Sequence, residues 1–340
     1  MTVTREWLAA IPKAELHVHL DGCVRPDTML ELGRRARVAL PADSPNALAQ
    51  AMLVRHAHNL EDYLDRYRYT VAVMQTRDAL QRIAREFVID VAAEGVRYVE
   101  VRFCPALHST TMSPQDALEA ALDGLVEGER ESRCLARLIV SALRTMPPSV
   151  SEELAHLAVA YRERGVVAFD LAGAEAGHPA VLHASAFQYA RRHDLACTCH
   201  AGEADGPASV WQAIRDCGAV RIGHGTRIAE DAALEAYVIE HGIPLEICLS
   251  SNVHTRAVAT IEDHPVRRYV ERGVVVTLNT DGRLMDGVSL IDEYALAARV
   301  FGFDREQLLR LVMNGFTTAF LPFKERDAMV ADMRRELGRG

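Results

Sequence analysis

The chain has 340 residues, of which 49% are hydrophobic and 25% are charged, and its formal net charge is −9. This composition is ordinary for a globular protein, and because no run of Lys or Arg stands out, nucleic acid is not an expected partner. The N-terminal residues lack the apolar core of a signal peptide, and no apolar stretch approaches the ~20 residues that a membrane-spanning helix needs.

Seven cysteines, an odd number, are spread along the chain without a CxxC pair. Several of them lie in apolar runs, which favours reduced and mostly buried thiols over a disulfide framework. We therefore expect a cytoplasmic protein. The sequence does not indicate an oligomeric state.

The first predicted element is a strand that ends in a turn, within the stretch 12–22. Alternate side chains of a strand point to the same side, so His17 and His19 should face the same way. Two imidazoles placed like this can bind one metal ion, but a motif this short often occurs by chance. The pair predicts a metal site only if other strands also end in ligands.

Helices and strands then alternate to the C-terminus. A helix should begin at Pro26, whose fixed φ suits the first helical position, and apolar residues recur at helical spacing from Leu80 to Val91. Ser113 and Asp116 form a capping box that should begin another helix. Further helices are expected near 151–164, 180–193, 208–217, 230–241 and 265–272, and beyond 282. Further strands are expected at 96–103, 135–142, 166–171, 195–199, 220–223, 244–249 and 274–279.

Eight short, apolar strands separated by helices predict a parallel sheet that is covered on both faces. Eight such units favour a single (β/α)₈ barrel of the TIM type over residues 1–340, with additional helices at the C-terminus. The length would also allow two domains, but no linker of low complexity divides the chain. In such a barrel, the active site lies at the C-terminal ends of the strands.

Polar residues follow several of these predicted strand ends. The fifth strand runs into His200 and Glu203, the sixth into His224, and the eighth into Asp281. Each residue alone has an ordinary structural explanation, but their convergence on one rim favours a common function. Ten other histidines are expected in helices or loops away from this rim: His56, His58, His108, His156, His178, His183, His193, His241, His254 and His264.

Four rim side chains can bind one zinc ion and leave a position for water: His17, His19, His200 and Asp281. Zinc lowers the pKa of its bound water from 15.7 to about 7, which makes a nucleophile at neutral pH. Glu203, in the turn after the fifth strand, can act as a general acid towards a ring nitrogen, and His224 can orient the attacking water. The set predicts hydrolysis at a C=N or C=O carbon.

Five short stretches at these strand ends occur in a fixed order: ELHVHLDG at 15–22, DLAG at 170–173, HAGE at 200–203, GHG at 223–225 and LNTD at 278–281. Together they resemble the adenosine deaminase family over nearly the whole chain, and the segment 244–252 resembles its bacterial branch. The resemblance implies a (β/α)₈ barrel that carries one zinc ion per chain. It also implies the hydrolysis of adenosine, and of 2′-deoxyadenosine, to inosine and ammonia.

The resemblance assigns a role to each matching residue. Asp281 would bind zinc and take a proton from the water, and Glu203 would protonate N1 of the purine so that zinc hydroxide adds at C6. His224 would stabilise the hydroxide. The backbone N–H of Gly173 would bind N3, at a distance that a side chain would prevent, and Asp21 would bind the ribose 5′-hydroxyl. The substrate-binding set is therefore His19, Asp21, Gly173 and Gly282.

Two positions depart from the family pattern. A carboxylate or an amide usually follows the metal-binding Asp and contacts N7 of the purine, but this chain has Gly282 there. Only water could then meet N7, and Gly282→Asp should restore the contact unless a positive φ requires glycine. In the apolar gate over the pocket, which Leu60 and Leu64 complete, Tyr63 replaces the phenylalanine that the family predicts.

Two alternatives remain open. One is a deaminase of a related 6-aminopurine, namely adenine, aminodeoxyfutalosine or a modified adenosine. The other is a non-catalytic zinc-binding protein on the same barrel, because fold alone does not determine function. Glu203 argues against the second, since a structural zinc site needs no general acid.

Overall fold

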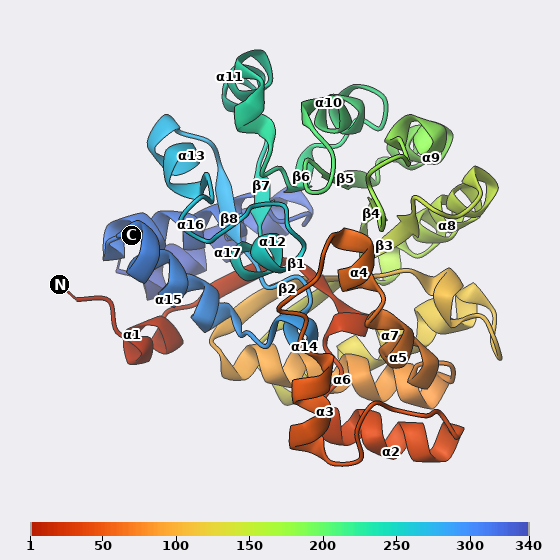
Figure 1. Ribbon diagram of the computed structural model, residues 1–340. Helices are drawn as coiled ribbons and strands as arrows, with labels where there is room; N and C mark the ends of the chain where they lie inside the picture. Colours follow the sequence, from red (N-terminus) through yellow and green to blue (C-terminus); the bar gives the residue numbers. More distant parts are fainter. Residues whose placement is uncertain (1, 339–340) are drawn as a thin grey trace.

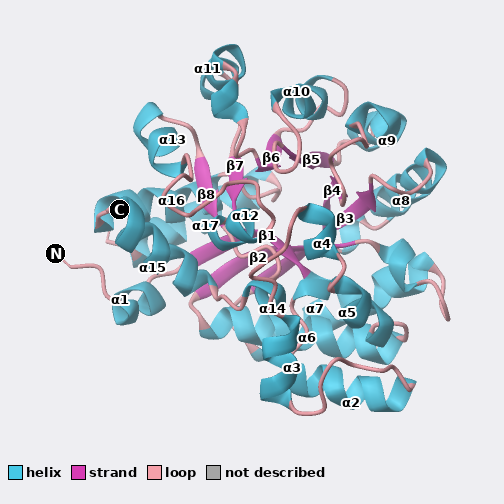
Figure 2. Ribbon diagram, viewed as in Figure 1, coloured by secondary structure: helices cyan, strands magenta, loops and turns pink. Residues whose placement is uncertain are grey.

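Eight parallel strands form the centre of the molecule, and helices surround them (Figures 1 and 2). The computed structural model describes residues 2–338. Each strand pairs with the next one in the chain. In order, the strands are β1 (Lys13–His19), β2 (Val96–Phe103), β3 (Leu135–Leu143), β4 (Val166–Ala172), β5 (Ala196–Ala201), β6 (Arg221–His224), β7 (Leu245–Ile247) and β8 (Val276–Leu278).

The sheet closes where β8 returns to β1. The backbone N–H of His19 donates to the Asp281 carbonyl at 2.9 Å, and the Asp281 N–H donates to the His17 carbonyl at 3.1 Å. The side chain of Asn279 joins the same seam, because its Oδ1 accepts from the backbone N–H groups of Leu16 and His17. This contact joins the last strand to the first, and the predicted (β/α)₈ barrel is confirmed.

The helices cover the outer face of the barrel (Figure 2). Those before β4 are α1 (Arg5–Ala10), α2 (Pro26–Ala36), α3 (Pro45–Met52), α4 (Leu60–Leu64), α5 (Tyr67–Val73), α6 (Arg77–Ala93), α7 (Pro114–Glu131) and α8 (Pro148–Ala160). Those after it are α9 (Ala184–Arg192), α10 (Pro207–Arg215), α11 (Ala232–Glu240), α12 (Leu249–His254), α13 (Val266–Arg272), α14 (Arg283–Asp286), α15 (Leu290–Phe301), α16 (Arg305–Thr317) and α17 (Phe323–Glu336). The C-terminal helices are as predicted, and α16 packs against β1 and β8.

Local sequence explains most of these boundaries. Ser113 and Asp116 form the expected capping box at the start of α7, and Pro26 is the first residue of α2. The apolar run 244–249 predicts one strand, but β7 ends at Ile247 and α12 begins at Leu249. Helical bonding starts there because the Asn252 N–H donates to the Cys248 carbonyl at 2.8 Å. A short apolar run cannot distinguish a buried strand from a buried helix.

Charged side chains are paired inside the barrel. The Arg221 guanidinium contacts Glu100 at 2.5 Å and also bonds Glu246, while Arg102 lies 2.8 Å from Glu246. All four side chains are buried, and buried charges persist only when they are paired. This network fixes the Glu246 carboxylate beneath the C-terminal end of β1.

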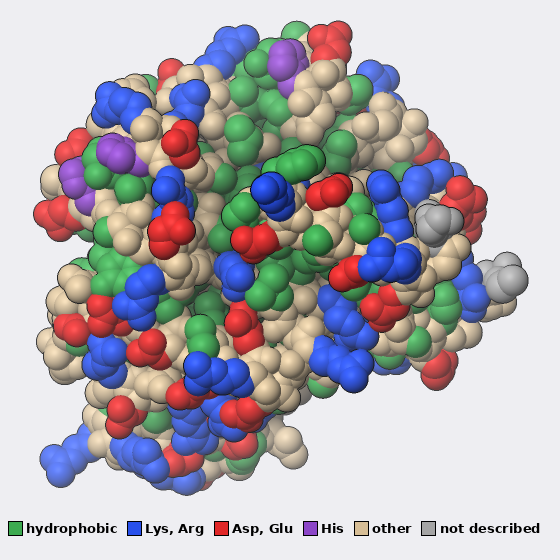
Figure 3. Space-filling view, turned by 180° about the vertical axis from the view of Figure 1, so that it is seen from behind, with side chains coloured by type: hydrophobic (Ala, Val, Ile, Leu, Met, Phe, Trp, Pro, Cys, Tyr) green, Lys and Arg blue, Asp and Glu red, His purple; other side chains and the backbone are tan. Residues whose placement is uncertain are grey.

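The cysteines, the hydropathy of the helices and the surface charges are also predicted from the sequence. All seven cysteines are free, and only Cys23 is partly exposed, in agreement with the sequence. No helix within residues 2–338 is both long enough and apolar enough to cross a membrane. Basic and acidic side chains are interspersed on the face shown in Figure 3.

Candidate active site

The predicted metal ligands meet at the C-terminal ends of β1, β5 and β8. The ligand atoms of His17, His19, His200 and Asp281 all lie within 4.8 Å of one another. A second group overlaps the first, because Glu203 and His224 lie within the same distance of Asp281. The structure therefore brings together every rim side chain that the strand ends predict.

The four ligand atoms fit a cation. His17 Nε2 is buried without a hydrogen-bond partner and lies 3.2 Å from Asp281 Oδ1. His19 Nε2 lies 3.3 Å from the same oxygen and 3.1 Å from His200 Nε2. The nitrogen lone pairs of the three histidines repel one another and the Asp281 carboxylate. A zinc ion bound to the three nitrogens and one oxygen would remove that repulsion.

Two buried carboxylates orient the histidine ligands. Glu246 lies 2.7 Å from His17 Nδ1, and Asp170 lies 3.1 Å from His200 Nδ1. Each carboxylate accepts a hydrogen bond from Nδ1–H of its histidine, so Nε2 of each ring carries no proton and keeps its lone pair for the metal. Burial alone would raise the pKa of Asp170, but His200 and Arg102 outweigh it and hold that pKa below its usual range.

Sequence reasoning assigned no role to either carboxylate. Asp170 lies in one of the five family stretches, and Glu246 is an acidic residue inside an apolar strand. A charged residue in a strand that is buried on both faces needs a partner. That rule is the signal that could have drawn attention to Glu246.

Two of the site residues adopt an unusual backbone conformation. His224 has a φ of 62° and Asp281 a φ of 61°, both in the left-handed region. This conformation costs about 1–3 kcal/mol for a residue other than glycine and is concentrated at functional sites. Ser251 of α12 then fixes the Asp281 side chain by donating to its Oδ2 at 2.6 Å.

Glu203 is held in a loop that another carboxylate organises. Glu175, which is buried, accepts hydrogen bonds from four consecutive backbone N–H groups, those of Gly202, Glu203, Ala204 and Asp205, at 2.6–3.0 Å. Burial, followed by the charges of Asp281 and Glu175, raises the pKa of Glu203 well above its usual value. A carboxyl that stays protonated at neutral pH can act as a general acid. No motif in the sequence indicates this role for Glu175.

A pocket of about 390 Å³ opens over these groups. Its lining includes Asp21 and Gly173, as the resemblance implies, and the gate residues Leu60, Tyr63 and Leu64 from α4. One carboxylate oxygen of Asp21 is buried without a partner, and burial raises the pKa of this group to about 7. Gly173 has a φ of 89°, which favours glycine. The volume suits a small-molecule ligand.

Gly282 does not line this pocket. Its φ is −109°, so the explanation by a positive φ is wrong. A Cβ atom at this position would instead lie 2.5 Å from the Tyr63 hydroxyl and 2.6 Å from the Tyr67 hydroxyl. Tyr63 donates to Asp286 at 3.0 Å, and Asp286 also bonds His254 at 2.7 Å. A side chain at position 282 would therefore have to displace two tyrosine hydroxyls that occupy its space.

Two histidines expected to lie away from the rim are connected to it. His254 reaches the tyrosine hydroxyls through Asp286, and His264 reaches His224 through Asn252. Neither belongs to the metal or acid–base groups, as expected, but each is linked to the site through one intervening residue. His254 is the last residue of α12 and His264 lies two residues before α13, and sequence spacing does not reveal that these segments pack near the strand ends.

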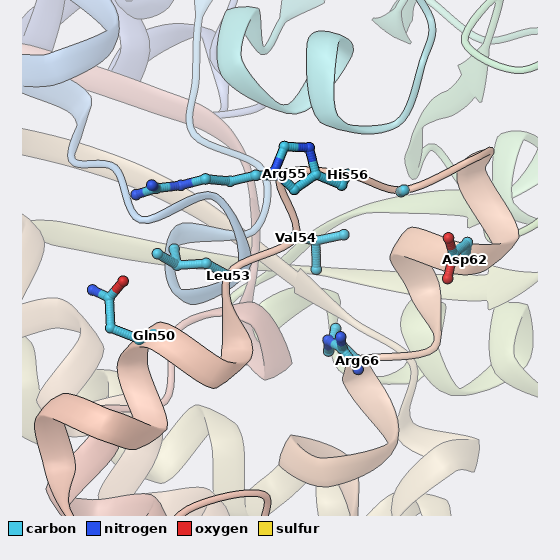
Figure 4. A pocket seen from close by; sticks show the side chains of 8 residues that line it. Gln50, Leu53, Val54, Arg55, His56, Asp62 and Arg66 are labelled. Atoms are coloured by element: carbon cyan, nitrogen blue, oxygen red, sulfur yellow. The ribbon is translucent and has the colours of Figure 1, made fainter.

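A second hollow lies on the other side of α4, between α3 and α5 (Figure 4). It is lined by Gln50, Leu53, Val54, Arg55, His56, Ala57, Asp62 and Arg66. None of these residues belongs to the metal or acid–base groups at the strand ends. The Arg55 and Arg66 side chains extend in different directions in Figure 4 and do not converge on one point.

Comparison with known proteins gives a consistent result. Residues 12–335 match the family model described as adenosine deaminase. The chain is 42% identical to the adenosine deaminase of Mycobacterium tuberculosis (strain H37Rv) over 351 residues, which cover 97% of this chain and 95% of the relative. The adenosine deaminase of Mycobacteroides abscessus is also 42% identical, with coverage of 95% and 94%.

Solved structures show the same architecture. Adenine deaminase from Arthrobacter aurescens has a TM-score of 0.89 at 26% identity, covering 97% of this chain and 100% of that one. An N6-mAMP deaminase from Arabidopsis has a TM-score of 0.86 at 28% identity, with coverage of 97% and 99%. A Burkholderia ambifaria amidohydrolase with bound zinc has a TM-score of 0.89 at 26% identity, with coverage of 99% and 94%.

Proposed function

Because the chain belongs to the adenosine deaminase family, a family of hydrolytic deaminases, we propose that it converts adenosine and 2′-deoxyadenosine to inosine and ammonia with one zinc ion per chain. The ligand set for that ion is His17, His19, His200 and Asp281. When bound, zinc lowers the pKa of a water molecule so that hydroxide is available at neutral pH.

The protein groups around the pocket divide the proton transfers between them. Glu203, whose pKa is raised by burial, donates to N1 of the purine and makes C6 more electrophilic. Asp281, whose Oδ1 lies 3.2 Å from His17 Nε2 and 3.3 Å from His19 Nε2, accepts the proton of the attacking water. His224 lies 3.4 Å from Glu203, between Nε2 and Oε2, and stabilises the charge on the incoming oxygen.

One observation carries the assignment to a nucleoside: the unpartnered, buried oxygen of Asp21 in the pocket wall. A buried acceptor without a partner costs free energy, and a ligand hydroxyl removes that cost. Free adenine has no hydroxyl to offer. A phosphate group would place negative charge beside this carboxyl, so adenosine suits Asp21 better than adenine or an adenine nucleotide.

The gate also bears on recognition of the purine. We propose that the hydroxyl of Tyr67 replaces the side chain missing at Gly282 by donating to N7, where sequence alone predicts only water, because the proton of Tyr63 is already donated to Asp286. Both tyrosines line the pocket, and both hydroxyls point to the space above Gly282. Gly282→Asp should then lower stability by collision with these hydroxyls rather than restore a contact to N7.

A substrate panel tests the proposal. We expect the loss of ultraviolet absorbance on deamination to give the highest kcat/KM with adenosine, above adenine, N6-methyl-AMP and aminodeoxyfutalosine. Higher kcat/KM with any of the other three would identify that compound's class as the substrate and overturn the assignment. Absence of turnover with all four, in zinc-loaded protein, would favour the non-catalytic alternative.

Asp21 supplies a sharper version of the same test. Asp21→Ala should lower kcat/KM for adenosine about ten- to a hundredfold, the range for a lost bond to a buried polar group. The substitution should have much less effect with 5′-deoxyadenosine, which lacks the hydroxyl. Equal losses of kcat/KM with both compounds would show that Asp21 does not bind the 5′-hydroxyl.

A further inference from the structure

We propose that Asn252 and His264 are positioning residues that hold His224 in the tautomer with its proton on Nε2. The proposal rests on the proposed function only for its catalytic consequence, since the tautomer itself can be measured without substrate. His224 ends β6, Asn252 belongs to α12, and His264 precedes α13. All three side chains are buried.

The chain of hydrogen bonds begins at a backbone N–H group, which can act only as a donor. The backbone N–H of Val266 points to His264 Nδ1 at 3.1 Å, and a backbone N–H can only donate. Nδ1 of His264 therefore accepts and carries no proton. Burial lowers the pKa of His264 to about 3, so the ring is neutral and its single proton is on Nε2.

Each following bond inherits its direction from the one before. His264 Nε2 lies 3.1 Å from Asn252 Oδ1, so the imidazole donates and the amide oxygen accepts. The amide nitrogen of Asn252 then faces His224 Nδ1 at 3.0 Å. An amide nitrogen can only donate, so His224 Nδ1 must accept.

The proton of His224 is left on Nε2, on the side of the pocket. Nε2 lies 3.4 Å from Glu203 Oε2, and His224 lines the pocket. A doubly protonated His224 is disfavoured because its Nδ1–H would face the N–H group of Asn252. In this state, His224 donates a hydrogen bond to an incoming oxygen but cannot take a proton from it at Nε2, which leaves that task to Asp281.

Nitrogen-15 NMR of histidine-labelled, zinc-loaded protein reads the tautomer directly, because the two-bond couplings to the ring protons differ between Nδ1–H and Nε2–H. The His224 signals are identified by their absence in His224→Gln. We expect Nε2–H for His224 and for His264 in the unmodified protein. A His224 ring with its proton on Nδ1, or with none on Nε2, would overturn the proposal, whatever the substrate of the enzyme.

Two substitutions at Asn252 separate polarity from packing. Asn252→Asp puts an acceptor opposite His224 Nδ1, so the His224 proton should move to Nδ1 and kcat should fall about 10²-fold or more, as on loss of a preorganised donor. Asn252→Ala removes the amide without imposing the opposite polarity, so kcat should fall less, with KM little changed in both variants. An unchanged Nε2–H tautomer in Asn252→Asp, or equal kcat in the two variants, would contradict the proposal. If neither variant folds, the spectrum of the unmodified protein decides.

Discussion

Glu203 is the residue whose environment is most closely matched to its proposed chemistry. Its carboxyl is buried between Asp281 and Glu175, and its pKa is raised by that burial and by those charges. Glu203→Gln keeps the size of the side chain but cannot readily donate a proton. We expect a fall in kcat of about 10²–10⁴-fold, the usual contribution of an acid–base group.

The matching controls are zinc content and binding of the product, inosine. Both should be unchanged in Glu203→Gln, because Glu203 is not among the four ligands that surround the metal position. Near-normal turnover in this variant would remove Glu203 as the acid. Loss of zinc together with activity would place Glu203 among the metal ligands.

The side chains that we propose to bind the metal or the substrate could be located from the sequence, because a strand end fixes where the side chains that follow it lie. His200 and Asp281 are of this kind. Glu175 could not be predicted in the same way, because its role depends on four backbone N–H groups in a loop that is distant in sequence. Gly282 shows a second limit, since its explanation lies in two tyrosine hydroxyls from α4 and α5.

At the scale of elements, the loop after β5 depends on Glu175. In Glu175→Gln, an amide NH₂ group faces backbone N–H groups that donated hydrogen bonds to the carboxylate. Each buried donor left unpaired costs about 1–3 kcal/mol. We expect lower stability, lower kcat and faster amide hydrogen exchange at residues 202–205.

Glu230→Gln is the comparison variant for that loop. Glu230 pairs with Arg227 at the surface and has a side chain 48% exposed, so its loss should change stability by less than about 0.5 kcal/mol. Unaltered exchange and kcat in Glu175→Gln would show that the loop holds Glu203 without this carboxylate.

The contact between α12 and α15 should make stability depend on pH. Glu293 on α15 is 1% exposed and accepts from Ser250 on α12, and burial raises its pKa from 4.5 to about 8. The folded protein thus retains a proton that the unfolded chain loses, so stability falls as pH rises from about 4.5 to about 8.

Glu293→Gln removes that titration and preserves the shape of the side chain. The difference in unfolding free energy, variant minus unmodified protein, should increase by about 3–5 kcal/mol across this pH range. Urea unfolding of the metal-free proteins at pH 5 to 9, in steps, measures it. A difference that is constant with pH would show that Glu293 is ionised in the folded protein.

For the molecule as a whole, the seam that closes the barrel also brings the proposed metal ligands of β1 and β8 together. His17 and Asp281 lie on opposite sides of the β1–β8 seam, and Asn279 joins the two strands through its side chain. Asn279→Ala should lower stability by about 2–5 kcal/mol through lost buried bonds, and it should weaken zinc retention as well.

Asn314→Ala separates these two effects. Asn314 on α16 donates one bond to the Val276 carbonyl on β8 at 2.9 Å, away from the ligands. This variant should lose stability but keep its zinc. Full zinc retention in Asn279→Ala would show that the metal site does not depend on the seam, and calorimetry with metal analysis gives both quantities.

The fold could be predicted from sequence because strands buried on both faces are apolar and separated by helices. Seven of the eight strands lie close to their predicted positions. The exception is the run ending at Leu249, where an apolar segment passes from β7 into α12 without a turn residue to mark the change. That departure places Ser251 and Asn252 against Asp281 and His224, so the least predictable element orients two site residues.

Under the proposed function, the four strand-end side chains bind one zinc ion, and activity towards adenosine depends on that ion. Titration of chelator-treated protein with zinc, followed by ammonia release from adenosine, tests it in one measurement. We predict no activity without zinc, then a linear rise that levels off at one zinc ion per chain. Full activity before zinc is added, or a rise that continues well beyond one ion per chain, would contradict the account.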